Sequence, residues 1–519
     1  MAMIDACVST ARCRFLLVAL VVAVSIVNVL YLSINCPIDL SGDEAQYWDW
    51  SRRLDLSYYS KGPAVAYIIA ASTSLFGDTM LAVRLPAIVM FAGITIGVYA
   101  LASRVFDSER TALLAAGLMQ LSPIFLFYSL AMTIDTPLVL CWTWATYFAV
   151  RAIIDGRRWA WIVVGVLLGL GFLAKYAALL WWVGMLAWGL IDRRRVRWGD
   201  ALAGFAVSLA FTAPVLIWNA RHDWVSFRHV AKQTGATGGS IFRGNFLELV
   251  GSQIGVVNPA IAILMIAAAG WAWKGGDSRR RMLLAIGATF FALTVIVSLF
   301  AKVQTNWPGP AYVTLIVLAA GFVADRAANA VSWRRWKGVV IAAVAIGIGA
   351  HVIGREPAML IRPLRAIGLP EDKLAAIDGL SRLRGWEELG RRVGEEARAL
   401  GDETIILCDS YMQTALMAFY VPGRPRTFYA GSYFTRPSRM TQYDLWDDCR
   451  LDRPELVGRN VVYVGKGGPM PDPLPAAFDR VEKLAEIPVY AGGVVVETFK
   501  VWRGWNFKGL ARPTGPRSY

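Results

Sequence analysis

Long apolar runs recur along this chain from Phe15 to about Ile353, and they constrain its fold more than any other feature. A run of about 20 apolar residues is long enough to cross the hydrocarbon core of a bilayer as a helix. Charged residues make up only 18% of the 519 residues, which is too few for a soluble protein of this size. We therefore predict an α-helical polytopic membrane domain over residues 1–354.

Arginines gather in the short loops between the apolar runs. They occur as Arg157–Arg158, Arg193–Arg195, Arg279–Arg281 and Arg334–Arg335. Loops that stay in the cytoplasm carry an excess of Lys and Arg, so these loops predict the orientation of the spans. They also account for much of the net charge of +15, and we expect no nucleic-acid partner.

Alternation across the membrane then predicts eleven spans, within an expected range of about 11 to 13 transmembrane helices. They lie near residues 15–34, 82–103, 111–130, 136–153, 159–174, 177–191, 199–218, 246–273, 282–300, 309–325 and 338–353. The first span has no obvious small-residue cleavage site, so we expect an uncleaved helix. The apolar stretch 64–76 is too short to cross comfortably, and we expect a helix that lies at the outer surface or dips into it.

This threading places most of the conspicuous polar residues on the outer face. They are Asp43, Glu44, Lys61, Asp135, Lys175, Arg221, His222, Lys302 and Asn306. A transporter would instead place charges at mid-depth in broken helices, often in two repeated halves. No internal repeat is apparent, so we favour chemistry at the outer face over transport; a flippase or transporter of lipid-linked intermediates remains the alternative.

The composition changes after Arg355, where the chain becomes polar and rich in charge and proline. Short apolar runs predict strands at 404–407, 460–464 and 493–501, and amphipathic stretches predict helices at 380–400 and 413–420. Alternating strands and helices indicate a soluble α/β domain over residues 355–519, which the threading places outside. Cys408 and Cys449 either pair in an oxidising compartment or stay as buried thiols.

The first outer loop, SGDEAQYWDWSRRLDLSYYSKGP, carries an acidic pair. Ser41 and Glu44 fit a capping box at a helix start, in which Glu44 is structural and Asp43 complements the helix dipole. A carboxylate at that position is also able to deprotonate an acceptor hydroxyl, or to bind a divalent cation together with its neighbour. The residues alone leave these interpretations open.

Lys61 follows two tyrosines, Tyr58 and Tyr59, in the same loop. A lysine ammonium is a compact point charge suited to a phosphate group. A snorkelling lysine beside an aromatic belt explains the pattern equally well. The same pair of interpretations applies to Lys175, which interrupts an apolar stretch next to Tyr176.

Two later outer segments carry further candidates, each of which also has a structural explanation. Asp135 begins a span as Asp-Thr-Pro, which also fits a helix start. Arg221 and His222 lie in a basic, aromatic segment with too few ligands for a convincing metal site. No nucleotide-binding motif stands out, and cations with a carboxylate at an outer face suit a lipid-phosphate donor.

Several segments together resemble the lipid-linked-sugar glycosyltransferases of the GT-C class: GDEAQYW, YYSKGP, LFGDTMLAVRLPA, DTP and FLAKY. Within that class the chain is most similar to the bacterial branch that contains the lipid A aminoarabinose transferase, which is related to the protein O-mannosyltransferases. VLIWNARHDWVSFRHV, TNWPGPAY and MTQYDLW also resemble that branch. The first-loop combination is the most specific part, and it departs mildly from many relatives, which have KPP where this chain has KGP.

The resemblance implies the GT-C fold, a polyprenyl-phosphate sugar donor and transfer on the periplasmic side of a bacterial inner membrane. It implies that Asp43 and Asp135 are the two acidic site positions, with Glu44 beside the first, and that Lys61 contacts the donor phosphate. We expect additional phosphate contacts from Lys175, Arg221 or Lys302. Further candidates for substrate contacts are Tyr58, Tyr59, Tyr176, His222 and Asn306.

The expected reaction moves the sugar to lipid A, a glycan or another cell-envelope acceptor. It requires no cofactor, although a divalent cation is an option. Transfer of the sugar to protein is also open, as is a non-catalytic scaffold whose outer domain binds glycans. The sugar and the acceptor are not identified by the sequence.

Overall fold

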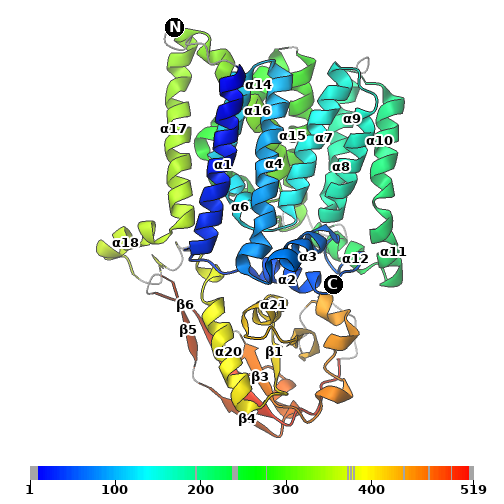
Figure 1. The fold of residues 1–519 in the computed structure, drawn as a ribbon, viewed down its shortest axis with the longest axis vertical. Helices are drawn as coiled ribbons and strands as arrows, with labels where there is room; N and C mark the ends of the chain where they lie inside the picture. Colours follow the sequence, from blue (N-terminus) through cyan, green and yellow to red (C-terminus); the bar gives the residue numbers. More distant parts are fainter. Residues whose placement is uncertain are drawn as a thin grey trace. The chain divides into compact units, whose positions relative to one another are not determined.

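The computed structural model consists of two compact units (Figure 1). It describes residues 10–34, 36–192, 196–235, 244–275, 277–370, 373–374, 377, 380–435, 439–465, 468–484, 486–491 and 494–512. The helical unit comprises Met1–Ile34, Lys61–Ile68 and Arg84–Gly354. The second unit comprises Asn35–Ser60, Ile69–Val83 and Arg355–Tyr519.

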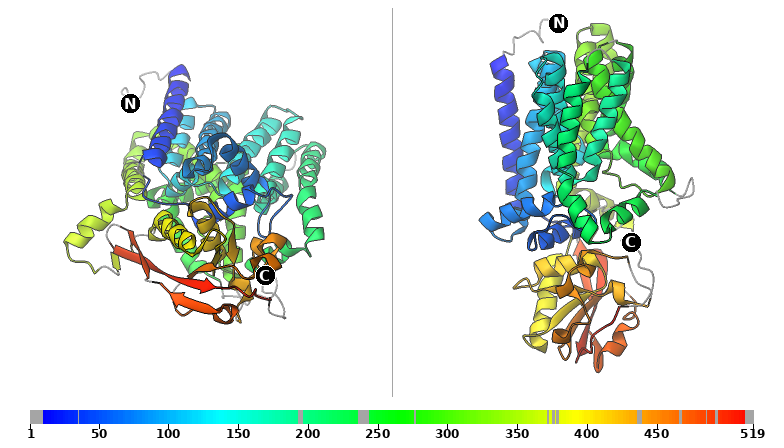
Figure 2. Two further views of the ribbon diagram at one scale, coloured as in Figure 1. Left: turned by 60° about the horizontal axis from the view of Figure 1, so that its bottom comes forward. Right: turned by 90° about the vertical axis from the view of Figure 1, so that its right-hand side faces the viewer.

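The helical unit is a bundle of roughly parallel helices around a core of small and aromatic side chains (Figures 1 and 2). Its helices are α1 (Thr10–Ile34), α4 (Met80–Phe106), α5 (Glu109–Gln120), α6 (Pro123–Leu130), α7 (Asp135–Ile154), α8 (Ala160–Ala174), α9 (Trp181–Ile191), α10 (Trp198–Ala210), α11 (Ala213–Arg221), α12 (Val225–Gln233), α13 (Phe246–Val257), α14 (Pro259–Lys274), α15 (Ser278–Phe300), α16 (Gly309–Ala327) and α17 (Ala330–Arg355). In the sequence, α3 (Ala64–Phe76) connects the two units. Within the bundle, α7 packs against α8 and α16, α8 against α10, and α16 against α14 and α15.

Seven of the described helices are long and apolar enough to cross a membrane, and up to nine spans result if two bent helix pairs each count as one. The predicted spans at 159–174 and 177–191 correspond to shorter apolar helices. The stretch 64–76 is a helix, as predicted. The Arg193–Arg195 loop lies outside the described residues. Every predicted span therefore has a helical counterpart, which supports a multi-pass membrane protein.

Two predicted spans differ from the straight helices that the sequence indicated. The span at 111–130 bends by 77° between α5 and α6, and the span at 246–273 bends by 103° between α13 and α14. Each second helix begins with a proline, Pro123 or Pro259, which lacks the N–H that would continue the preceding helix. Asn258 has a φ of 89° at the second break and caps α14 by accepting the Ala260 N–H.

Helix α7 separates two polar layers of the helical unit, one at each of its ends. Its 20 residues rise about 30 Å, the thickness of a bilayer hydrocarbon core. At the C-terminal end, Asp155 accepts from Arg104 and from Arg151. Nearby loops are joined by Arg158–Asp200 and Arg279–Asp107 ion pairs of 2.9 and 2.8 Å. The arginine-rich loops at 157–158 and 279–281 therefore lie at one end of the helical unit, and Asp135 lies at the other.

The second unit contains a six-stranded mixed sheet. Its elements are α2 (Gly42–Ser51), α18 (Ala358–Ala366), α20 (Trp386–Leu400), β1 (Ile405–Cys408), α21 (Tyr411–Tyr420), β2 (Thr427–Tyr429), β3 (Val461–Gly465), β4 (Arg480–Lys483), β5 (Ile487–Ala491) and β6 (Val494–Trp505). The strand order is β2-β1-β3-β6-β4, with β5 paired to β6. Strands β1, β2 and β3 are parallel, whereas β6 is antiparallel to β3, β4 and β5.

The central strands are apolar on both faces because both faces of the sheet are covered. Leu407 of β1 and Tyr463 of β3 belong to a core that includes Phe478 and Trp502. The alternate residues of these strands are also buried, and α20 and α21 pack on β3 and β1 (Figure 1). Buried parallel strands have this continuous apolar pattern. The predicted α/β domain is therefore confirmed.

The loop after α1 packs in the second unit, which the sequence did not indicate. The Asp39 carboxylate accepts the Trp386 N–H at 2.7 Å and caps α20. The Leu40 N–H donates to the Tyr420 hydroxyl at 2.7 Å, and the Tyr59 N–H donates to the Gln442 side chain at 2.7 Å. The first loop thus belongs to the same compact unit as Arg355–Tyr519, because its backbone groups are satisfied by residues far along the chain. The predicted domains 1–354 and 355–519 stay a prediction.

The secondary structure of the second unit departs from prediction at several points. The predicted helix at 380–400 begins only at Trp386, since Gly385 adopts a φ of 79°. Strands β2, β4 and β5 were not predicted, because they are short or lie next to turns. Cys408 and Cys449 are both buried free thiols.

Candidate active site

Helix α2 begins with the capping box that Ser41 and Glu44 predicted. The Glu44 N–H donates to the Ser41 hydroxyl at 3.2 Å, and the Ser41 N–H donates to the Glu44 carboxylate at 3.0 Å. Two N–H groups that a helix start leaves without helical partners are thereby satisfied. Glu44 is 1% exposed, so its carboxylate serves the helix start.

Asp43 has a different environment from Glu44, although both belong to the first turn of α2. Its side chain is exposed. Burial, together with the charge of Asp43, raises the pKa of the nearby Tyr411 phenol. The structure thus separates the two carboxylates: Glu44 is part of the cap, whereas Asp43 faces outward from a rigid helix start.

Helix α2 is fixed by close packing on α21. A Cβ atom added to Gly42 would lie 2.6 Å from Cβ of Met412, so glycine is required for this approach. The Trp48 indole N–H donates to the Asp78 carboxylate at 2.8 Å. The Trp48 ring also meets Phe419 edge-on, with 4.9 Å between ring centroids. These contacts hold the helix that carries Asp43.

The segment MTQYDLW, residues 440–446, holds the first loop at three points. Gln442 accepts the Tyr59 N–H, and the Tyr443 hydroxyl donates to the Asp49 carboxylate at 2.9 Å. The Arg53 guanidinium lies 4.1 Å from the ring centroid of Trp446. Both segments stand out in the sequence, but nothing in their spacing indicates that they meet.

Asp49 is buried at the centre of this contact. Burial raises the pKa of its carboxyl above the ordinary value of 3.8, and Arg53, Arg52 and the Tyr443 hydrogen bond oppose that increase. The Arg52 guanidinium lies 3.6 Å from Asp49, and Arg53 also reaches Asp448 at 3.3 Å. Asp49 therefore has polar partners on both sides, and its hydrogen bond with Tyr443 links the first loop to the 440–446 segment.

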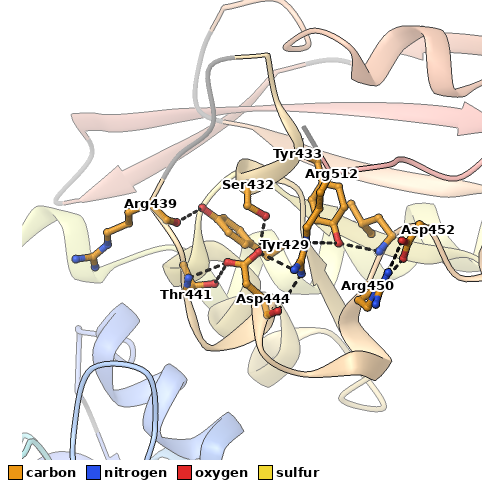
Figure 3. A network of polar contacts seen from close by, with 10 residues as sticks. Tyr429, Ser432, Tyr433, Arg439, Thr441, Asp444, Arg450, Asp452 and Arg512 are labelled. Carbon is orange, nitrogen blue, oxygen red and sulfur yellow. Dashed lines mark hydrogen bonds and ion pairs between the residues drawn. The ribbon is translucent and has the colours of Figure 1, made fainter. Parts of the chain in front are cut away.

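A second network orients the 440–446 segment itself (Figure 3). Asp444 accepts from the Ser432 hydroxyl at 2.5 Å and from the Thr441 N–H at 2.8 Å. Arg512 donates to the Asp444 carbonyl at 3.0 Å and to the Tyr433 hydroxyl at 3.1 Å. The chain near Arg512 thus helps to shape the surface on which the first loop rests.

The two tyrosines of the first loop are part of its internal structure. Tyr58 is buried and stacks on Trp50, with 4.5 Å between the ring centroids. Its hydroxyl donates to the carbonyls of Trp50 and Arg53 at 3.1 and 3.0 Å. Tyr59 is also buried, and its N–H is the group bound by Gln442. The substrate contacts predicted for both tyrosines stay predictions.

Asp135 is the centre of the polar cluster in the helical unit. It is 1% exposed at the start of α7. The Lys175 ammonium donates to one carboxylate oxygen at 2.6 Å, and the Asn306 side-chain amide donates to the other at 2.5 Å. Three residues that the sequence predicted for separate roles are therefore joined in one network.

The segment TNWPGPAY closes this cluster from the start of α16. The Tyr128 hydroxyl donates to the Asn306 carbonyl at 3.2 Å. A Cβ atom on Gly309 would lie 2.0 Å from that hydroxyl, so glycine permits the close approach. The Lys175 ammonium also lies 5.8 Å from the ring centroid of Trp307. The loop before α16 thus fixes Asn306 on Asp135.

Lys61 lies at the same end of the helical unit as this cluster. A Cβ atom on the adjacent Gly62 would lie 2.1 Å from the Leu173 carbonyl oxygen, two residues before Lys175. The backbone beside Lys61 therefore touches the end of α8. Glycine in place of the more usual proline has a local physical reason here, because this contact leaves no space for a side chain.

The remaining predicted residues lie on α11, in the turn after α8 and in the loop after α15. The His222 ring lies 2.8 Å from the Trp218 carbonyl through Nδ1 and stacks on the Trp218 ring. Tyr176 packs between Phe172 and Phe227. Arg221 and Lys302 are exposed. His222 and Tyr176 thus have structural contacts within their own segments, and the substrate or phosphate contacts predicted for these four residues stay predictions.

Metal binding was left open by the sequence. In the parts of the chain that the structure describes, no three His, Cys, Asp or Glu side chains form a group suited to a metal ion. Binding of a divalent cation, which the sequence left as an option, therefore stays untested.

A family model matches the part of the chain that holds most of this cluster. The model described as dolichyl-phosphate-mannose-protein mannosyltransferase matches residues 60–218. The matched region contains Lys61, Asp135 and Lys175, and it ends before the loop that provides Asn306.

A longer match is to the lipid A galacturonosyltransferase RgtD of Rhizobium johnstonii. It is 30% identical over 379 residues, which cover 71% of this chain and 75% of the relative. The chain belongs to the GT-C polyprenyl-phosphate-sugar glycosyltransferases. A shorter match within this glycosyltransferase family is to the undecaprenyl phosphate-alpha-4-amino-4-deoxy-L-arabinose arabinosyl transferase of Pseudomonas savastanoi. It is 29% identical over 147 residues, covering 28% of this chain and 26% of the relative.

Solved structures support the GT-C fold. ArnT from Cupriavidus metallidurans bound to undecaprenyl phosphate matches with a TM-score of 0.62 and 16% identity, covering 93% of this chain and 97% of that chain. The apo oligosaccharyltransferase of Archaeoglobus fulgidus matches with a TM-score of 0.50 and 11% identity, covering 87% and 69%. The predicted fold class and the assignment as a membrane glycosyltransferase are confirmed.

Proposed function

We propose that this glycosyltransferase moves a sugar from a polyprenyl-phosphate donor to lipid A at the periplasmic face of the bacterial inner membrane. The relationship to RgtD carries the proposal, because that match covers three quarters of a lipid A galacturonosyltransferase. The end of α7 that holds Asp135 is opposite the arginine loops, and the positive-inside rule favours a periplasmic position for it. By the same relationship, galacturonic acid is the first sugar to test.

Lys61 is the proposed contact for the donor phosphate. A cation near this phosphate stabilises the negative charge that grows as the polyprenyl phosphate leaves. Lys175 contributes less charge to the donor, since Asp135 already forms a 2.6 Å ion pair with it. Asp135 and Asn306 then act by positioning Lys175, and Arg221 or Lys302 supply additional positive charge.

Asp43 is the proposed base for a hydroxyl acceptor. The acceptor oxygen attacks the anomeric carbon, and the bond from that carbon to the phosphate oxygen breaks. The polyprenyl phosphate leaves with the electron pair, and the acceptor proton passes to Asp43. An acceptor that is already an anionic phosphate needs positioning by Asp43 instead of deprotonation. The proposed roles of Asp43 and Lys61 require no metal ion. Transfer activity measured in the presence of EDTA tests whether the reaction needs one.

The direct test is an in vitro assay with purified protein, polyprenyl-phosphate galacturonic acid and lipid A. We expect Lys61→Ala and Asp43→Asn each to lower kcat about 100-fold or more. Lys337→Ala and Asp447→Asn are matched controls, because both side chains are exposed on other elements. Full activity of the Lys61 and Asp43 variants would overturn the assigned roles. Movement of the lipid-linked sugar across vesicles without a glycosidic product would instead indicate a transporter.

A further inference from the structure

A pocket of about 450 Å³ lies at the arginine-rich end of the helical unit, away from the Asp135 cluster. It is formed by the C-terminal ends of α14 and α16 and by the first turns of α17. Its lining includes Trp271, Lys274, Phe322, Arg326 and Trp336. None of its lining residues is acidic.

Three cations lie in or beside this pocket, and two of them form ion pairs with aspartates outside its lining. Within the described part of the chain, Lys274 forms no ion pair and its side chain is exposed. The Arg326 Nε atom is buried without a hydrogen-bond partner, since Asp325 lies 3.7 Å away, beyond hydrogen-bond distance. A third cation, Arg280, lies 3.9 Å above the Trp271 ring and 3.5 Å from Asp277.

The aromatic rings make the pocket rigid and amphipathic. Phe322 meets Trp336 edge-on at 4.8 Å and Trp271 at 6.2 Å between centroids. The Arg326 guanidinium lies 5.0 Å from the Phe322 ring centroid. Rings with cations at their edge favour a ligand that has an anionic group beside an apolar body.

The surface next to the pocket is suited to acyl chains. Ile266, one turn before Gly270 of the lining, is 75% exposed on α14. Ile341, five residues after Trp336 of the lining, is 57% exposed on α17, whose apolar window is only 11% buried. In a membrane these side chains face lipid, so the pocket joins a lipid-facing surface at the level of the headgroups.

We propose that this pocket binds the phosphate group of an anionic phospholipid, with Lys274 and Arg326 holding the phosphate. Basic pockets between transmembrane helices bind anionic headgroups in this way, and each Lys or Arg near the surface contributes about 1 kcal/mol. A soluble phosphate compound would lose the contribution of the exposed isoleucines. The site is separate from the sugar-transfer site and does not depend on its assignment.

The test measures lipid binding to the purified full-length protein by native mass spectrometry. The probes are dioleoyl phosphatidylglycerol, dioleoyl phosphatidylcholine, glycerol 3-phosphate and inorganic phosphate. We expect phosphatidylglycerol to bind most tightly, and K274Q/R326Q to weaken it about 30-fold, or roughly fivefold for each cation. R110Q/R157Q removes two exposed arginines that do not line the pocket and should retain phosphatidylglycerol binding.

A second variant fills the pocket without removing charge. An added Cβ at Gly270 meets no atom within 4 Å, so Gly270→Leu extends into open space and should fold. We expect it to abolish phosphatidylglycerol binding, whereas Gly349→Leu, with equally open space on α17, should not. The proposal is overturned if phosphatidylcholine binds as tightly, if either phosphate compound competes equally, or if both pocket variants bind phosphatidylglycerol normally.

Discussion

At the scale of single residues, Asp135 illustrates how a predicted catalytic carboxylate is bound by partners that lie far along the chain. Both of its oxygens already accept hydrogen bonds, from Lys175 and Asn306. The sequence placed all three on one face of the membrane. It was not able to show their bonding, because they lie 40 and 171 residues apart from Asp135 along the chain.

The ion pair predicts a specific pattern of stability. Lys175→Met leaves Asp135 buried without its cation, and removing one partner of such a pair costs about 3 kcal/mol. We expect the double variant D135N/K175M to recover part of this loss, because it leaves no uncompensated charge. Thermal unfolding in detergent measures both effects. Additive losses in the double variant would show that the two residues act independently.

Gly62 provides a second test at this scale. An added Cβ would lie 2.1 Å from the Leu173 carbonyl, so Gly62→Ala forces the backbone beside Lys61 away from α8. We expect transfer activity to fall about tenfold, with a larger KM for the donor, because a displaced contact positions the donor poorly. Gly77→Ala is an informative comparison, since Gly77 has open space around it but a φ of 74°. Unchanged donor KM in the Gly62 variant would contradict the role of this contact in placing Lys61.

At the scale of elements, the first turn of α2 carries Glu44, which caps the helix, next to Asp43, the proposed base. Ser41→Ala removes the hydroxyl that accepts the Glu44 N–H, and such a change costs about 1 kcal/mol of stability. Asp43→Asn keeps the capping box, so we expect nearly normal unfolding and lost activity. Differential scanning fluorimetry beside the transfer assay distinguishes the two. An Asp43 variant that unfolds as early as the Ser41 variant would assign Asp43 to the cap.

The contact between the first loop and the 440–446 segment predicts a pH dependence. Burial raises the folded-state pKa of Asp49 above 3.8, so its protonated form is favoured in the folded protein. The protonated Asp49 carboxyl contributes this stability fully below about pH 4, and the contribution is lost as the pH rises through the folded-state pKa. We therefore expect the wild type to lose stability relative to Asp49→Asn as the pH is raised from about 4 to about 8. A constant difference between the two melting curves would contradict this.

The elements also show where sequence reasoning succeeded and where it ended. Apolar length and arginine loops were sufficient to locate a helix for every predicted span. The sequence was also sufficient to predict the bends at Pro123 and Pro259, since each proline follows a polar residue inside an apolar run. Short strands such as β2 were not, because three residues carry no periodic signal.

At the scale of the whole molecule, the division into units assigns the two proposed site residues of the first loop to different units. Asp43 belongs to the second unit, whereas Lys61 belongs to the helical unit. The proposed acceptor base and the proposed donor contact are thus carried by one loop that enters both units. Family resemblance identified the loop, but only the fold showed that residues 35–60 are held by side chains near residue 442.

The proposed function is the modification of lipid A with a sugar from a polyprenyl-phosphate donor. Mass spectrometry of lipid A from a deletion strain tests it most directly, with complementation by the wild type and by Asp43→Asn. We expect lipid A to lose the mass of one sugar in the deletion strain, the wild type to restore it, and the Asp43 variant to fail. Lipid A of unchanged mass in the deletion strain would contradict the proposed function.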